Sequence, residues 1–150
     1  MGMWILSLSS FLHILATVVW IGGIYMILLV ILPGAKAGLE PAMVGKLMKE
    51  ITKKFTAMAN ISILVLIATG ILIAYYSEEN WNAVMILKHF LVALMIGIHF
   101  WRMLILNPKI GRLSSQDEIV RLQRFSLFLV KTNLILGIIV LLLTGISLSL

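Results

Sequence analysis

The stretch that decides the fold runs from Trp4 to Leu32 and reads WILSLSSFLHILATVVWIGGIYMILLVIL. It contains no Asp, Glu, Lys or Arg, and it is longer than the roughly 20 apolar residues needed to cross a hydrocarbon core. It is also too long for the apolar part of a signal peptide and has no basic residues before it. We therefore expect a transmembrane helix that the mature protein retains.

Three further apolar segments follow, and the whole chain has the composition of a membrane protein. Hydrophobic residues make up 61% of the 150 residues and charged residues only 12%, whereas soluble domains carry about 25% charged residues. The sequence predicts an all-α fold, an up-and-down four-helix bundle in the membrane that forms a single domain over residues 1–150. No internal repeat is evident. The four segments are about 4–32, 56–76, 82–106 and 125–149. We expect Pro33-Gly34 to close the first segment and Asn107-Pro108 to close the third.

Two of the connections have amphipathic patterns. In residues 41–55 the apolar residues Val44, Leu47 and Ile51 recur at helical spacing with lysines between them. Residues from Ser115 onward show a similar pattern before the fourth segment. We expect both to form short amphipathic helices on the cytoplasmic membrane surface.

The charges indicate how the chain is oriented. Every Lys and Arg except Lys88 lies near the first or the third connection, whereas the second connection carries only Glu78 and Glu79. Basic loops stay in the cytoplasm, so we expect both termini outside a plasma or inner cell membrane. The net charge of +6 then reflects topology and contact with anionic membrane lipid, and gives no reason to expect binding to nucleic acid.

The chain has no cysteine, so any haem or metal site must use His, Met, Lys or carboxylate ligands. Ionisable residues within the membrane are costly, and they mark functional sites by default. Four candidates stand out: His13, Lys88, His89 and His99.

Two of the histidines have matched positions along their segments. His13 lies 9 residues after Trp4, and His89 lies 8 residues after Trp81. Two imidazoles at matched depth on parallel helices could ligate one b-type haem. His99 lies ten residues beyond His89, which is about 15 Å further along a helix.

Other residues complete the predicted site. Trp20 shares a helix face with His13, and Lys88 or Arg102 could neutralise haem propionates. Met95, His99 and Met103 form a stripe that would suit Cu(I). Alternatively, each histidine could serve only as an interhelical hydrogen-bonding group.

Two segments resemble known membrane families. LHILATVVWIGGI, residues 12–24, has a His followed seven residues later by W-x-G-G, and Lys88 is followed eleven residues later by His99. These patterns resemble the copper-resistance D (CopD) membrane domain and the HemJ-type protoporphyrinogen oxidases. LGIIVLLLTGI, residues 136–146, is similar to the CopD domain.

The resemblance implies a four-helix membrane bundle whose site residues include His13, Lys88 and His99. HemJ-type relatives carry haem b and oxidise a porphyrinogen, whereas CopD relatives have a proposed role in copper passage or resistance. The depth of the histidines favours His89 as the partner of His13, while the resemblance favours His99.

The leading hypothesis is a membrane protein that binds b-type haem and handles electrons, either in electron transfer or as an oxidoreductase similar to a porphyrinogen oxidase. Its partner would be a quinone, a porphyrin or a redox protein. The alternative is a copper transport or resistance protein with His and Met ligands. A third hypothesis is a structural subunit whose polar residues only join helices or associate with a larger membrane complex. Under any of these hypotheses the chain could form a homo-oligomer.

Overall fold

A computed structural model describes residues 2–76 and 82–147, and the chain divides into two compact units, 1–80 and 81–150. All elements in the described residues are helical, which confirms the all-α fold class. The expectations for Glu78, Glu79 and Trp81 lie outside the described residues. The single domain stays a prediction, and each unit is described here by itself.

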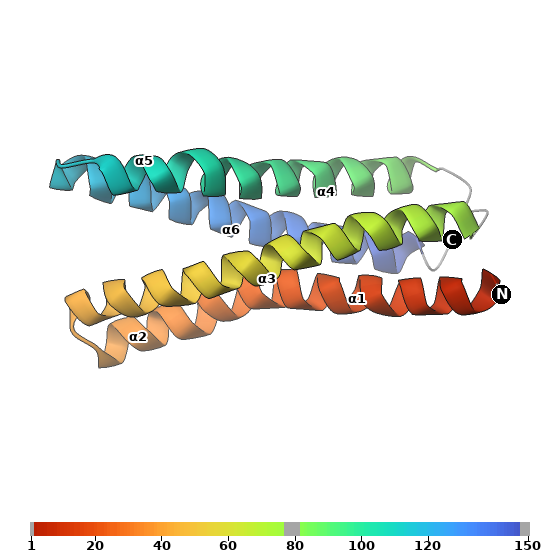
Figure 1. Ribbon diagram of the computed structural model, residues 1–150, viewed down its shortest axis with the longest axis horizontal. Helices are drawn as coiled ribbons and strands as arrows, with labels where there is room; N and C mark the ends of the chain where they lie inside the picture. The colour runs from red at the N-terminus through yellow and green to blue at the C-terminus, as the bar shows by residue number, and fades with distance from the viewer. Residues whose placement is uncertain (1, 77–81, 148–150) are drawn as a thin grey trace. The chain divides into compact units, whose positions relative to one another are not determined.

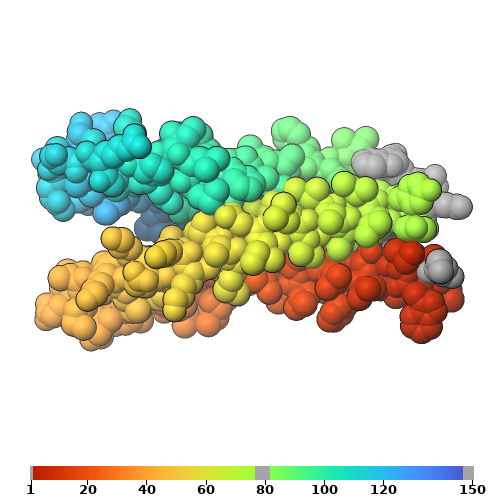
Figure 2. All heavy atoms as spheres, in the orientation of Figure 1, coloured from red at the N-terminus to blue at the C-terminus, as the bar shows by residue number. Residues whose placement is uncertain are grey.

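The first unit is a helical hairpin. Helix α1 (Gly2–Met26) continues through the π-helical turn η1 (Ile27–Ile31) into α2 (Leu32–Gly38), and α3 (Pro41–Tyr76) returns antiparallel to this first arm (Figure 1). In the space-filling view, the atoms of α3 lie against those of α1 and α2 (Figure 2).

The second unit has the same order of elements. Helix α4 (Ala83–Trp101) continues through the π-helical turn η2 (Arg102–Leu106) into α5 (Asn107–Arg112). Helix α6 (Gln116–Ser147) then returns and packs along α4 (Figure 1).

Four helical runs are long and apolar enough to cross a membrane. Many of their large apolar side chains are exposed, including Leu64 (66% exposed) and Phe90 (65%). Such continuous apolar surface would drive association in water, whereas in lipid it is the expected outer surface of a helix. The chain is a multi-pass membrane protein. The four runs are Gly2–Gly38, Pro41–Tyr76, Ala83–Arg112 and Gln116–Ile146.

A π-helical turn carries the first arm past its proline. The N–H of Leu32 donates to the carbonyl of Ile27, five residues earlier, and Pro33 follows directly. Proline lacks an N–H and its ring crowds the carbonyl four residues before it, and a wider π turn accommodates both effects. The expectation that the first segment closes at Pro33 is therefore wrong, because the helix continues to Gly38.

The second unit also has a π-helical turn just before its proline. The N–H of Asn107 donates to the carbonyl of Arg102, and Pro108 follows directly. Here too the helix was expected to close at the proline, but it continues to Arg112.

The amphipathic stretches are not separate surface helices. Residues 41–55 form the first turns of the 36-residue helix α3, and the residues after Ser115 form the first turns of α6. No proline interrupts either helix after its first residue, so the backbone hydrogen bonds continue without a break into the apolar part. The prediction of short helices on the membrane surface is corrected accordingly.

The two units repeat one plan at a spacing of 75 residues. The π turns begin at Ile27 and Arg102, the prolines stand at Pro33 and Pro108, and α3 and α6 also begin 75 residues apart. Each pair of positions has the same place in its unit, so the chain contains two copies of one helical hairpin.

Only short matches in sequence accompany this repeat, which the sequence reading missed. Ile-Gly at 21–22 recurs at 96–97, and Thr-Gly-Ile at 69–71 recurs at 144–146. At many other equivalent positions the two copies have different apolar residues, because a lipid-facing helix requires only apolar character.

Close contact between α1 and α3 depends on a glycine. A Cβ added at Gly23 would lie 2.9 Å from Cζ and 3.0 Å from Cδ2 of Phe55, which is closer than side chains tolerate. A Cβ added at the neighbouring Gly22 would meet nothing within 4 Å. Gly23 thus allows the Phe55 ring to pack against the backbone of α1.

We predict that Gly23→Ala lowers the free energy of unfolding by about 1–3 kcal/mol, because overpacking displaces the Phe55 ring. Thermal unfolding in detergent would measure this. Gly22→Ala is the matched control and should leave stability unchanged or slightly raised. Gly23→Ala combined with Phe55→Leu should recover most of the loss; equal melting temperatures for the two alanine variants would contradict the contact.

Candidate functional site

His13 is tied to the facing helix by a hydrogen bond. Its Nδ1 lies 2.8 Å from Oγ1 of Thr69 on α3, and the His13 side chain is half-buried. The Thr69 side chain is almost wholly buried. Side chains on a helix lean toward its N-terminus, which for antiparallel α1 and α3 brings the His13 ring toward the later turns of α3.

The hydrogen bonds around Thr69 determine which nitrogen of His13 carries the proton. The Thr69 hydroxyl has one hydrogen, and its oxygen lies 2.6 Å from the carbonyl of Val65 and 3.3 Å from that of Leu66. Two acceptors face this oxygen, so the hydroxyl donates to the backbone and accepts from His13 Nδ1–H. The neutral ring then has its lone pair on Nε2.

The surroundings of His13 are tightly packed. A Cβ added at Gly70 would lie 3.7 Å from Cε1 of His13, so the ring lies against the backbone of α3 at Gly70. Trp20, seven residues after His13, is only 2% exposed. The polar and aromatic stripe predicted on α1 therefore faces the interior of the protein at Trp20 and is partly buried at His13.

We predict that a double-mutant cycle with His13→Ala and Thr69→Val gives a coupling free energy of about 0.6–1.7 kcal/mol, the range for interhelical hydrogen bonds in membranes. Reversible unfolding in detergent or bicelles would provide the four stabilities. Thr17→Val is a suitable control with His13→Ala, because among residues 2–76 and 82–147 the Thr17 hydroxyl bonds only the His13 carbonyl, at 2.8 Å. Additive effects in the His13–Thr69 cycle would show that the pair does not interact.

The second unit has two hydrogen bonds between α4–η2 and α6. Asn133 Nδ2 donates to the carbonyl of Met95 at 3.2 Å, and Arg102 Nε donates to Ser126 Oγ at 3.1 Å. In two antiparallel helices, the residue numbers of facing positions have a constant sum. This sum is 228 for both hydrogen bonds and 78 for two contacts of the first unit, 23 with 55 and 2 with 76. Adding 75 to both residues of a pair raises the sum from 78 to 228, so the two units have the same antiparallel register.

His99 lies between these two hydrogen bonds. It is 6% exposed and stands one helical turn after Met95, which is 1% exposed. Asn133 is 3% exposed, and its Oδ1 is buried without a hydrogen-bond partner in the described part of the chain. Met103, the third member of the predicted stripe, is only half-buried, because it lies within η2, where the wider turn breaks the regular helical spacing.

Lys88, and not His89, occupies the position equivalent to His13. Adding 75 to 13 gives 88, and Lys88 is half-buried. His89 is exposed, and its Nδ1 lies 2.7 Å from the carbonyl of Met85 one turn earlier. His89 thus lies in the helical turn that corresponds to the turn of His13, but the more buried side chain of that turn is Lys88.

Three polar residues of these contacts were missed in the sequence: Thr69, Ser126 and Asn133. Each lies at membrane depth in a helix, and such residues tend to hydrogen-bond between helices. That general rule could have marked them as buried. Their partners follow only from the antiparallel register.

No group of three or more His, Cys, Asp or Glu side chains that could hold a metal ion occurs within residues 2–76 and 82–147. A haem site requires fewer protein ligands, because the porphyrin supplies four of the iron's ligands. His13 suits such a ligand, since metal-binding histidines commonly donate their other ring N–H to a fixed acceptor. Thr69 provides that acceptor.

The family described as domain of unknown function DUF4149 matches residues 15–119, which is 105 of the 150 residues. The chain belongs to the DUF4149 family. The match covers both π turns and the segment that carries Lys88 and His99, and begins two residues after His13. No curated protein and no solved structure matches the chain.

Proposed function

We propose that this DUF4149 protein binds b-type haem in the membrane and handles electrons, with His13 Nε2 as an axial ligand. The observation that carries the proposal is the hydrogen bond from His13 Nδ1 to Thr69 Oγ1, which leaves the basic electron pair on Nε2. The resemblance of the His13 and Lys88–His99 patterns to HemJ-type and CopD membrane proteins supports the same assignment.

The other proposed residues have distinct roles. Of the two histidines in the second unit, His99 is the better candidate ligand, because it is buried whereas His89 is exposed. Lys88 is the better partner for a haem propionate, because the Nε of Arg102 already donates to Ser126. Haem would supply the one-electron chemistry, and the chain would supply ligands, orientation and an apolar environment. A quinone, a porphyrin or a redox protein would exchange the electrons.

We predict that purified wild-type protein shows a Soret band, with sharp α and β bands after dithionite, and that His13→Ala abolishes them. Thr69→Val should retain haem but lower its occupancy or shift the reduction potential, because the ring loses its fixed acceptor. Absorption spectra and haem-to-protein ratios would measure both effects. His89→Ala, at an exposed position, is the control and should leave the spectrum unchanged.

A colourless wild-type protein that stays colourless after haem is added would rule out the haem proposal. An unchanged spectrum in folded His13→Ala protein would remove His13 from the site.

Copper binding is a second candidate, favoured by one observation. Met95 and His99 are buried one turn apart on the same face of α4, which gives a thioether and an imidazole suited to Cu(I). Met103 would be a weaker third ligand, since it is less buried. Copper bound to protein without a Soret band, and lost in Met95→Leu, would favour this candidate over haem.

The basic ends of both hairpins are proposed to face the cytoplasm of a cell with a plasma or inner membrane, with both termini outside. The absence of cysteine allows a direct test with single introduced thiols. In intact cells, Met3→Cys should react with a membrane-impermeant maleimide, whereas Lys36→Cys should react only after permeabilisation. The reverse labelling pattern would invert the topology.

A further inference from the structure

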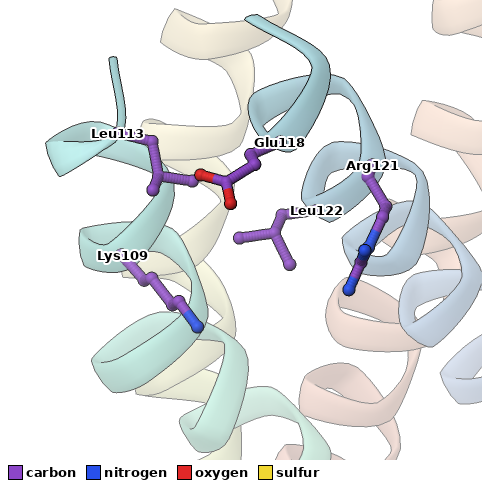
Figure 3. A pocket seen from close by; sticks show the side chains of 5 residues that line it. All are labelled: Lys109, Leu113, Glu118, Arg121 and Leu122. Atoms are coloured by element: carbon purple, nitrogen blue, oxygen red, sulfur yellow. The ribbon is translucent and has the colours of Figure 1, made fainter. Parts of the chain in front are cut away.

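A charged hollow lies between α5 and the start of α6. It has a volume of about 90 Å³ and is lined by Lys109 and Leu113 on the first arm and by Glu118, Arg121 and Leu122 on the second. Figure 3 shows the Lys109 and Arg121 side chains directed to the same end of the hollow, on either side of Leu122. The Glu118 carboxylate lies toward the other end, near Leu113.

The two cations of this hollow have no acidic partner in the described part of the chain. Neither Lys109 nor Arg121 forms an ion pair or a hydrogen bond with Glu118 there. Arg121 also lines a wider neighbouring hollow together with Asp117, Val120 and Arg124. The site therefore has a net positive charge and two groups that are available to an anion.

The length of the helix places the hollow at the membrane surface. The run Ala83–Arg112 has 30 residues, about 45 Å of helix, whereas the hydrocarbon core is about 30 Å thick. The apolar part ends at Leu106, so Lys109 follows it by one turn, at the level of the lipid headgroups. Leu113 and Leu122 add apolar side chains beside the charged ones.

The repeat shows that this hollow is particular to the second unit. Arg121 and Arg124 correspond to Lys46 and Lys49 of α3, and Lys109 corresponds to Gly34. The first unit thus has cations on its second arm, but at the position equivalent to Lys109 it has a glycine, and the cation of its first arm is Lys36, two residues further on. Its cations are lysines, which act as point charges, whereas the arginine fork can hold two phosphate oxygens at once.

We propose that the hollow between α5 and α6 binds the headgroup phosphate of an anionic phospholipid. Arg121 holds the phosphate through its guanidinium group and Lys109 adds a second charge from the facing arm. Basic pockets beside transmembrane helices are suited to such headgroups. Glu118 accepts a hydrogen bond from a hydroxyl of the polar headgroup, as in phosphatidylglycerol. This proposal does not depend on haem or copper.

The test is a titration of the full chain in detergent with phosphatidylglycerol, followed by native mass spectrometry. The double variant Lys109→Gln/Arg121→Gln should lower the affinity by at least about tenfold, because charge-assisted hydrogen bonds to phosphate are lost. The matched control Lys46→Gln/Lys49→Gln removes the same charge from the first unit and should lower it by no more than about threefold.

Four results would overturn the proposal. An equal loss in the two double variants would indicate diffuse attraction to the basic surface. Tighter binding of phosphatidylethanolamine would contradict the requirement for an anionic lipid. Displacement of the lipid by an equal concentration of inorganic phosphate would indicate a site for free phosphate.

If the double variant does not fold, the single variant Arg121→Lys replaces it. A decrease in lipid affinity of more than about threefold would support bidentate binding of the phosphate by Arg121, and an unchanged affinity would be the fourth result that refutes the proposal.

Discussion

Every feature of the fold depends on one constraint, that backbone polar groups within a membrane must be paired inside the protein. No water is present in the hydrocarbon core to bond an open N–H or C=O group. Long continuous helices satisfy this constraint, and each proline leaves the carbonyl four residues before it without its usual N–H donor. The chain places a π turn before Pro33 and before Pro108, so each helix continues past a residue that would end a regular one.

The internal repeat separates what the fold requires from what it does not. Both hairpins have the same π turn, the same proline and the same antiparallel register, so these features belong to the scaffold. Exchanges between apolar residues at equivalent positions are compatible with this scaffold, whereas a buried polar residue in place of an apolar one is not explained by it. His13 is matched by Lys88, and His99 (6% exposed) is matched by Ile24 (4%). A buried imidazole where the other copy has an isoleucine is not needed to build the hairpin, which makes His99 a candidate site residue.

The sequence predicted the four apolar helices because composition and length alone decide whether a segment can cross a membrane. It missed the ends of the first and third helices because proline usually ends a helix, and only the structure shows a π turn in its place. It missed the repeat because lipid-facing positions need only apolar side chains, so two copies can lose nearly all identity while keeping one fold.

For the candidate site, the sequence identified His13 and Trp20 on one face, and their burial follows that pattern. It could not identify Thr69 as the partner of His13, since the contact joins residues 56 positions apart. Counting residues also favoured His89 over His99 as the partner of His13, yet His89 is exposed, because such a count gives the turn of a helix but not which residue points inward. A difference of one residue rotates a side chain by about 100°.

The hydrogen bond between His13 and Thr69 also bears on the role of His13. The Thr69 hydroxyl donates to the backbone of its own helix and accepts from Nδ1–H of the ring. This contact orients the ring and leaves the lone pair of a neutral imidazole on Nε2, the form that binds a metal. A ligand role for His13 would use this orientation, because metal-binding histidines commonly donate their other ring N–H to a fixed acceptor.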